Sequence, residues 1–108
     1  MKDIASHLKR EKPNLSPNSL KVYTLNLQKI FKGIELDNED ITIKNIAKKK
    51  EDILKFLSSY PDNTARNYIN AVIMFIKTLD GKNEKLLEDL GKKRDALHTT
   101  YKNKVDNH

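Results

Sequence analysis

Residues 61–79 form the richest apolar segment of the chain and have the sequence PDNTARNYINAVIMFIKTL. The segment begins with a turn and helix-cap cluster and then continues without a glycine or a proline. Its apolar residues recur at intervals of three and four, the spacing of a helix rather than the alternation of a strand. At about 100° per residue they cover an arc about 160° wide, which predicts a helix at the centre of the core. The residues of this apolar face are Ala65, Tyr68, Ile69, Val72, Ile73, Phe75, Ile76 and Leu79.

The same predicted helix has a narrow polar edge, formed by Arg66, Asn70 and Lys77. The chain as a whole contains 21 basic and 15 acidic residues, which give a net charge of +6. A basic surface favours a polyanionic partner, with nucleic acid ahead of an acidic membrane surface. Many lysine-rich helices are simply solvated, so charge alone indicates a class of partner without establishing one.

Length and composition indicate one small domain. A chain of 108 residues can bury a single core without disulfides or metals, and this one contains no cysteine. No apolar run approaches the roughly 20 residues of a membrane span, and residues 1–10 lack the apolar centre of a signal peptide. We therefore expect an intracellular protein with no membrane partner, in the cytoplasm or nucleus.

Groups that could carry catalysis or bind a metal are sparse. His7, His98 and His108 are widely spaced and have no carboxylate partner at ligand spacing, so we predict no metal and no other cofactor. No Ser-His-Asp or Cys-His arrangement is present in the sequence pattern, and we do not expect this chain to be an enzyme.

Turn and cap signals divide the chain into helices. Ser16 and Pro17 suit the cap and first position of a helix that ends at Gly33. Lys48, Lys49 and Lys50 lie at the start of another helix, where the dipole disfavours cations; a partner or plain solvation would explain them. We expect a marginal helix over residues 2–12, main helices over 16–32, 48–59, 61–79 and from 83 or 84 toward the end, an acidic loop over 35–40, and an extended segment or single helical turn over 41–46.

A shift of 45 residues superimposes two of these helices. The shared pattern is Asn, then Ser or Thr, then a base and a Tyr, followed by apolar residues at matched turns. Any two amphipathic helices share a period, so the match has an ordinary explanation beside that of an internal repeat. The matched pairs include Asn18 with Asn63, Ser19 with Thr64, Lys21 with Arg66, Tyr23 with Tyr68, and Lys32 with Lys77.

The segments LSPNSLKVY (15–23), ILKFL (53–57) and DNTARNYINA (62–71) resemble the N-terminal core-binding domain of tyrosine recombinases and phage-type integrases. Integrase-like proteins of large DNA viruses are the most similar in character. The resemblance covers about residues 15–100 and implies an all-α, SAM-like bundle of four or five helices, built from two pseudo-repeated helical units. Residues 1–14 would then be an N-terminal arm or short helix, and residues 101–108 the end of the last helix leading into a linker.

In that family the domain forms one half of a clamp around duplex DNA. The resemblance therefore implies contacts with double-stranded DNA from two helix N-termini and their basic stripes. We expect Tyr23 and Tyr68 to pack in the core instead. The implied contact residues are Asn18, Ser19, Lys21, Thr24 and Lys32 on one helix, and Asn63, Thr64, Arg66, Asn67, Asn70 and Lys77 on the other.

The catalytic motifs of the family, with their Arg, His and nucleophilic Tyr, have no counterpart in this sequence. The resemblance therefore implies a binding module that does not cut or join DNA, with self-association on DNA an option for the full-length protein. The alternative is a helical protein–protein interaction module. It would use the last helix, through Leu97, Tyr101 and Val105.

Overall fold

The computed structural model describes the backbone of residues 3–79, 81 and 83–106, and the side chains of these residues except 38 and 98–106. This part of the chain is helical and contains no strand, which confirms the all-α fold class. It has one more helix than the four or five expected. The elements are α1 (Ile4–Glu11), α2 (Pro17–Gly33), the 3₁₀ turn η1 (Asn38–Asp40), α3 (Ile43–Lys48), α4 (Lys50–Leu57), α5 (Asp62–Thr78) and α6 (Glu84–Asp106).

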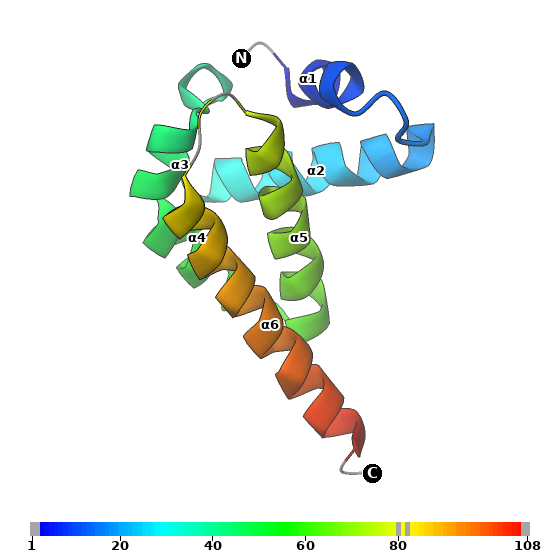
Figure 1. Cartoon of the computed structure of the whole chain (residues 1–108), viewed down its shortest axis with the longest axis vertical. Helices are drawn as coiled ribbons and strands as arrows, with labels where there is room; N and C mark the ends of the chain where they lie inside the picture. Colours follow the sequence, from blue (N-terminus) through cyan, green and yellow to red (C-terminus); the bar gives the residue numbers. More distant parts are fainter. Residues whose placement is uncertain (1–2, 80, 82, 107–108) are drawn as a thin grey trace.

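Helix α5 lies at the centre of the bundle, as its apolar spacing predicted (Figure 1). Helix α6 runs antiparallel to α5 and extends beyond the first turn of α5. Helix α2 crosses α5 at a steep angle. Helix α4 packs on α5 and α2, α3 packs on α4, and α1 covers the junction of α2 with the end of α5. The buried residues of α5 are Ala65, Tyr68, Ile69, Ala71, Val72, Ile73, Phe75 and Ile76.

Helix α2 begins at the predicted residues, but its C-terminal stop differs from the one predicted. Ser16 caps it by accepting a hydrogen bond from the Ser19 amide at 3.1 Å. Gly33 is the last helical residue, and the left-handed residue that stops the helix is Glu35, with φ of 59°. The Leu36 amide donates to the Phe31 carbonyl at 2.8 Å, and the Glu35 amide donates to the Lys32 carbonyl at 3.1 Å. These two bonds define a Schellman motif, with Phe31 and Leu36 as its buried apolar contact.

Gly33 does not supply the left-handed residue that ends α2; it allows close packing between α2 and α4. A Cβ atom at this position would lie 2.4 Å from Cε2 of Phe56, which is on α4. The missing side chain thus allows the Phe56 ring to lie against the α2 backbone. From there the ring contacts Tyr60, with centroids 5.2 Å apart, and Tyr60 in turn contacts Tyr68 at 5.1 Å. The glycine therefore positions an aromatic cluster that joins α2, α4 and α5.

The predicted helix over 48–59 is divided in the structure. Residues 43–48 form α3 and α4 begins at Lys50, with Lys49 between them. Lys48 therefore lies at the end of a helix, where the dipole favours a cation, and the first turn of α4 carries Glu51 and Asp52. Lys50 Nζ lies 2.8 Å from Oδ2 of Asp89 on α6. The lysine cluster thus has structural explanations, and no partner is needed to account for it.

Helix α1 belongs to the core, although its eight residues are too few for a stable isolated helix. Ile4 and Leu8 are fully buried. His7 Nε2 lies 2.8 Å from Oγ1 of Thr78, at the end of α5, and the His7 ring meets the Phe75 ring edge-on at 5.5 Å. Tertiary packing therefore holds a segment whose sequence predicted only a marginal helix.

Helices α2 and α5 are each 17 residues long, and their first residues are 45 positions apart. These bounds agree with the register of the sequence overlay. The two helices nevertheless cross, and their first turns lie on different sides of the molecule (Figure 1).

Candidate functional site

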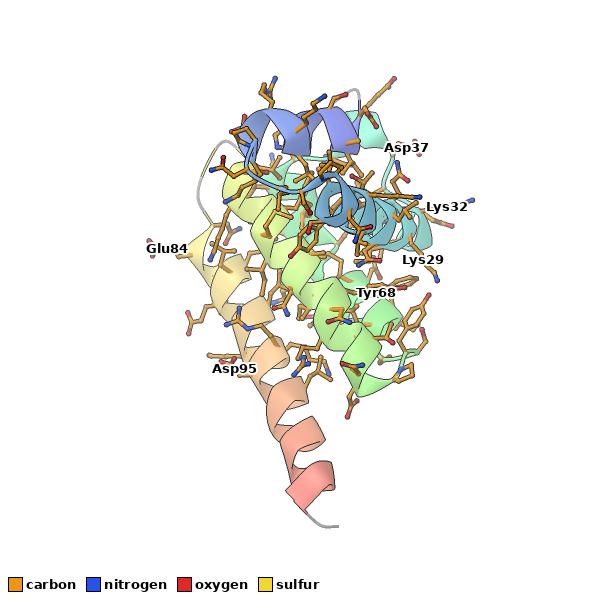
Figure 2. The ribbon with its side chains drawn as sticks, turned by 90° about the vertical axis from the view of Figure 1, so that its right-hand side faces the viewer. Lys29, Lys32, Asp37, Tyr68, Glu84 and Asp95 are labelled. Atoms are coloured by element: carbon orange, nitrogen blue, oxygen red, sulfur yellow. The ribbon has the colours of Figure 1, made fainter. Side chains whose placement is uncertain are left out.

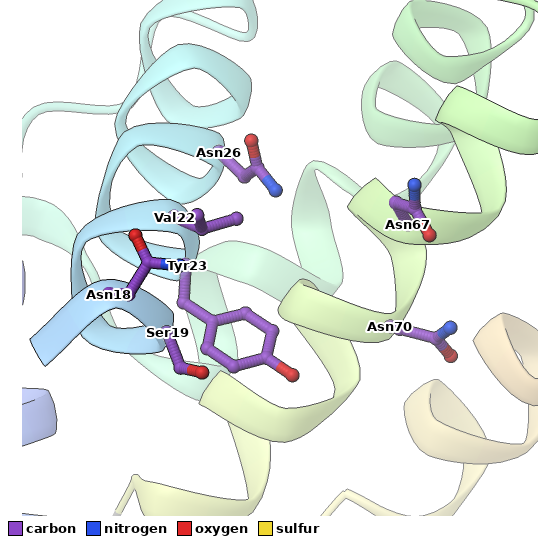
Figure 3. Close-up of a pocket in the computed structure, with 7 residues that line it drawn as sticks. All are labelled: Asn18, Ser19, Val22, Tyr23, Asn26, Asn67 and Asn70. Atoms are coloured by element: carbon purple, nitrogen blue, oxygen red, sulfur yellow. The ribbon is translucent and has the colours of Figure 1, made fainter. Parts of the chain in front are cut away.

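The first half of α2 and the first half of α5 meet in a groove of about 360 Å³ (Figure 3). Its lining unites four residues that the sequence predicted to act together: Asn18 and Ser19 from α2, and Asn67 and Asn70 from α5. Figure 3 shows the Tyr23 ring projecting from α2 between the two helices. The full lining is Asn18, Ser19, Val22, Tyr23, Asn26, Asn67 and Asn70.

Helix geometry explains this combination. Asn18, Val22 and Asn26 are spaced by four and share a face of α2, and Asn67 and Asn70 are spaced by three on α5. Asn26 and Val22 were not predicted as site residues, because their selection depends on how α2 crosses α5. The four-residue spacing from Asn18 was the only available signal in the sequence.

Tyr23 and Tyr68 occupy matched positions but have different environments. Tyr68 is buried, as expected, with 8% of its surface exposed. Tyr23 is half-buried: it packs against the core and also lines the groove. The prediction that both rings belong to the core is therefore only partly correct for Tyr23.

A second hollow of about 290 Å³ adjoins the groove through Asn67 and Asn70, which line both. Its other lining residues are Arg66 of α5, and Arg94 and Asp95 of α6. Arg94 Nε lies 3.5 Å from Oδ1 of Asp95. The polar surface thus continues from α2 across α5 to α6, and Arg66 lies on it as predicted.

The charges around the groove are mostly positive. Helix α2 contains no Asp or Glu, and α5 contains one acid, Asp62, in its first turn. Lys21 is exposed on α2, and Arg66 is half-buried beyond the α5 side of the groove. No carboxylate lines the groove itself. An anion approaching this surface would meet amides in the groove, and Arg66, Arg94 and the carboxylate of Asp95 in the adjoining hollow.

Several predicted residues lie elsewhere. Lys32 lines a separate hollow with Glu35 and Asp37, where nearby carboxylates oppose anion binding. Lys77 lies beside apolar residues near the start of α6. Asn63 is exposed and Thr64 half-buried in the first turn of α5, and neither lines the groove.

Thr24 is the predicted contact that the structure does not support. Its side chain is buried, with 8% exposed, and Oγ1 has no hydrogen-bond partner among the described residues. A hydroxyl in this position cannot reach a ligand at the surface. The resemblance to recombinase core-binding domains implied Thr24 as a contact, but that face of α2 turns into the core.

Lys29 was not predicted, and its surroundings are structural. Figure 2 shows Lys29 and Lys32 projecting from α2, with Tyr68 nearby on α5. Lys29 Nζ lies 5.3 Å from the centroid of the Tyr60 ring. A hydrogen bond with Tyr68 is the main cause that raises the pKa of Lys29 above its ordinary value, and the electrostatic effect of Tyr60 is the second cause. Lys29 therefore contacts the aromatic cluster through Tyr60 and Tyr68.

Metal-holding clusters and membrane-spanning helices are both absent from the part of the chain that the structure describes. No group of three or more His, Cys, Asp or Glu side chains is placed there to hold a metal ion. Within the same residues, every helix is too short or too polar to cross a bilayer.

Comparison of the chain with protein-family models, curated proteins and solved structures found no match. The resemblance to recombinase core-binding domains therefore rests on the residues quoted above.

Proposed function

We propose that this chain is a non-catalytic DNA-binding module of the kind found at the N-terminus of tyrosine recombinases and integrases. The observation that carries the proposal is the groove between α2 and α5. It brings Asn18, Ser19, Asn67 and Asn70 onto one surface, with Arg66 in the adjoining hollow and Lys21 exposed on the same helix as Asn18. Such a protein would act in the cytoplasm or nucleus, wherever its DNA target lies.

The two kinds of side chain would have different roles. Lys21 and Arg66 would bind backbone phosphates, which supplies affinity that falls as salt rises. The amides of Asn67 and Asn70 carry a donor and an acceptor each and are suited to base edges. The phosphates would fix the position of the duplex, and the amides would read it.

A salt titration of duplex binding tests the proposal. We expect the affinity for a labelled 20-bp duplex to fall with a log–log slope of about −2 to −4, corresponding to roughly two to four neutralised phosphates. Absence of binding at low salt, or affinity that ignores ionic strength, would contradict it.

Charge reversal locates the surface. Lys21→Glu and Arg66→Glu should each weaken duplex binding by about tenfold or more, since each replaces an attraction with a repulsion. Lys44→Glu is the matched control, because Lys44 is exposed on α3, away from the groove, and the change in net charge is identical. Equal losses in all three variants would mean that net charge, and not this surface, determines binding. Circular dichroism of each variant checks that the helices are intact.

One observation favours the alternative of a protein–protein interaction module. Helix α6 continues beyond the first turn of α5, so its last turns have no neighbouring helix on that side (Figure 1). Leu97 is buried, whereas the predicted contacts Tyr101 and Val105 lie outside the described side chains. Self-association that depends on concentration, measured by sedimentation without DNA, together with no affinity for duplex, would favour this alternative.

A further inference from the structure

The groove differs chemically from its flanks, because no charged side chain lines it. Its polar groups are four asparagine amides and the hydroxyls of Ser19 and Tyr23. Phosphate is bound best by cations, so this lining suits a neutral ligand with hydrogen-bonding edges. The cations near the groove would therefore bind an anionic part of a partner, and the groove itself would bind a neutral part of the same partner.

The amides are available for a ligand. Among the described residues, the side chains of Asn18, Asn26, Asn67 and Asn70 form no hydrogen bond with the rest of the chain. Each offers an N–H donor and a carbonyl acceptor side by side. This is the pairing that matches the N6 and N7 edge of adenine.

The groove also contains apolar surface. Val22 is one of two large hydrophobic side chains that are clearly exposed, with 48% of its surface accessible. It lies beside the half-buried ring of Tyr23 (Figure 3). An aromatic ring next to an aliphatic side chain provides a surface on which a planar ring can stack.

The volume limits what can enter. About 360 Å³ lies near the lower end of the range for small-molecule pockets, roughly 300–1,000 Å³. That is space for about one base with its sugar. A base inside a duplex can present its edge to the amides, but it must leave the stack to place its face against Tyr23 and Val22 as well.

We propose that the groove between α2 and α5 binds a single unpaired nucleobase, with adenine preferred. The base stacks against Tyr23 and Val22 and bonds through its edge to Asn67 or Asn70, while the flanking cations bind the adjacent phosphates. This inference rests on the proposed DNA-binding function and adds the structural class of DNA that binds best.

The test compares three duplexes of one sequence: fully paired, with one bulged adenine, and with an abasic bulge at the same position. The abasic bulge keeps the extra phosphate and the local flexibility but lacks the base. We expect the full chain to bind the adenine bulge about tenfold more tightly than the abasic bulge, as measured by fluorescence anisotropy at one salt concentration.

Two variants assign the preference to the groove. The double variant Asn67→Ala/Asn70→Ala should bind adenine and abasic bulges within about twofold of each other. Gln28→Ala is the control, because Gln28 is an exposed amide on α2 outside the groove, and it should keep the tenfold preference.

The outcomes separate this inference from the proposed function. Salt-dependent binding of all three duplexes with equal affinity would overturn the base-binding inference and leave the duplex-binding function in place. Failure to bind any of them would overturn both. A preference that survives in Asn67→Ala/Asn70→Ala, in a variant with wild-type melting behaviour, would also overturn the assignment to this groove.

Discussion

Replacing Glu35 with glycine should stabilise the protein by about 1 kcal/mol. Glu35 has φ of 59°, and a left-handed backbone costs a residue with a Cβ atom about 1–2 kcal/mol. Glycine removes that cost but loses about 0.5–1 kcal/mol more conformational entropy on folding. Removing a carboxylate from the C-terminal end of α2 contributes about 0.3 kcal/mol at an exposed position. Both Schellman hydrogen bonds are formed by backbone groups and remain in the variant.

Urea unfolding followed by circular dichroism measures this change. For a domain of this size, about 1 kcal/mol corresponds to a rise of roughly 4 °C in the melting temperature and of about 0.5–1 M in the urea midpoint. Glu35→Gln is the control, since it removes the charge but keeps the strained backbone, and it should gain only about 0.3 kcal/mol. If Glu35→Gly were no more stable than Glu35→Gln, the strain assigned to Glu35 would be refuted.

A companion variant separates backbone strain from packing. Gly33→Ala should gain up to about 1 kcal/mol of helix propensity but place a methyl group 2.4 Å from the Phe56 ring. Overpacking of this kind costs about 1–3 kcal/mol, so we expect a net loss. The loss should disappear in a Phe56→Ala background, because the clashing ring is gone. A loss that persists there would show that Gly33 is required for its backbone conformation.

Three other predictions concern charges and the docking of α1. A hydrogen bond from Lys50 lowers the pKa of Asp89, so this pair stabilises the fold above the ordinary carboxyl pKa and loses that effect as the pH falls through the lowered pKa; Asp89→Asn should lower the melting temperature at pH 7, and the difference should shrink steadily as the pH falls below the ordinary carboxyl pKa. Thr78→Val should remove the hydrogen bond with His7 at a cost of about 1 kcal/mol, and amide hydrogen exchange should then accelerate in α1 more than in α5. Lys32→Ala should change duplex affinity by less than about threefold, because Lys32 lies beside carboxylates and away from the groove.

Local sequence signals predicted the main helices well because they act within one or two turns. Ser16 and Pro17 start α2, and the unbroken apolar spacing of residues 62–78 defines α5 as the central helix. The stop of α2 was assigned to Gly33 because glycine usually occupies the left-handed position. The structure has Glu35 there, and Gly33 instead allows the close approach of Phe56.

The candidate site was predictable only as two separate stripes. Sequence spacing shows which residues share a face of one helix, but the groove depends on where α2 crosses α5. That crossing brings Asn18 and Asn67 together, separates Lys32 from Lys77, and buries Thr24. These outcomes are set by tertiary packing, which a single helical period does not contain.

The docking of α1 has a consequence for the order of events during synthesis. His7 and Thr78 are 71 positions apart, so at about 5–20 residues per second a ribosome needs roughly 4–14 s to make the second partner after the first. During that interval Ile4 and Leu8 belong to a helix too short to persist alone, and α5 is not yet available to cover them. Until α5 is made, α1 has α2 to pack against but lacks its second partner, and for those seconds a chaperone or a protease could act on the incompletely covered helix before the bundle closes.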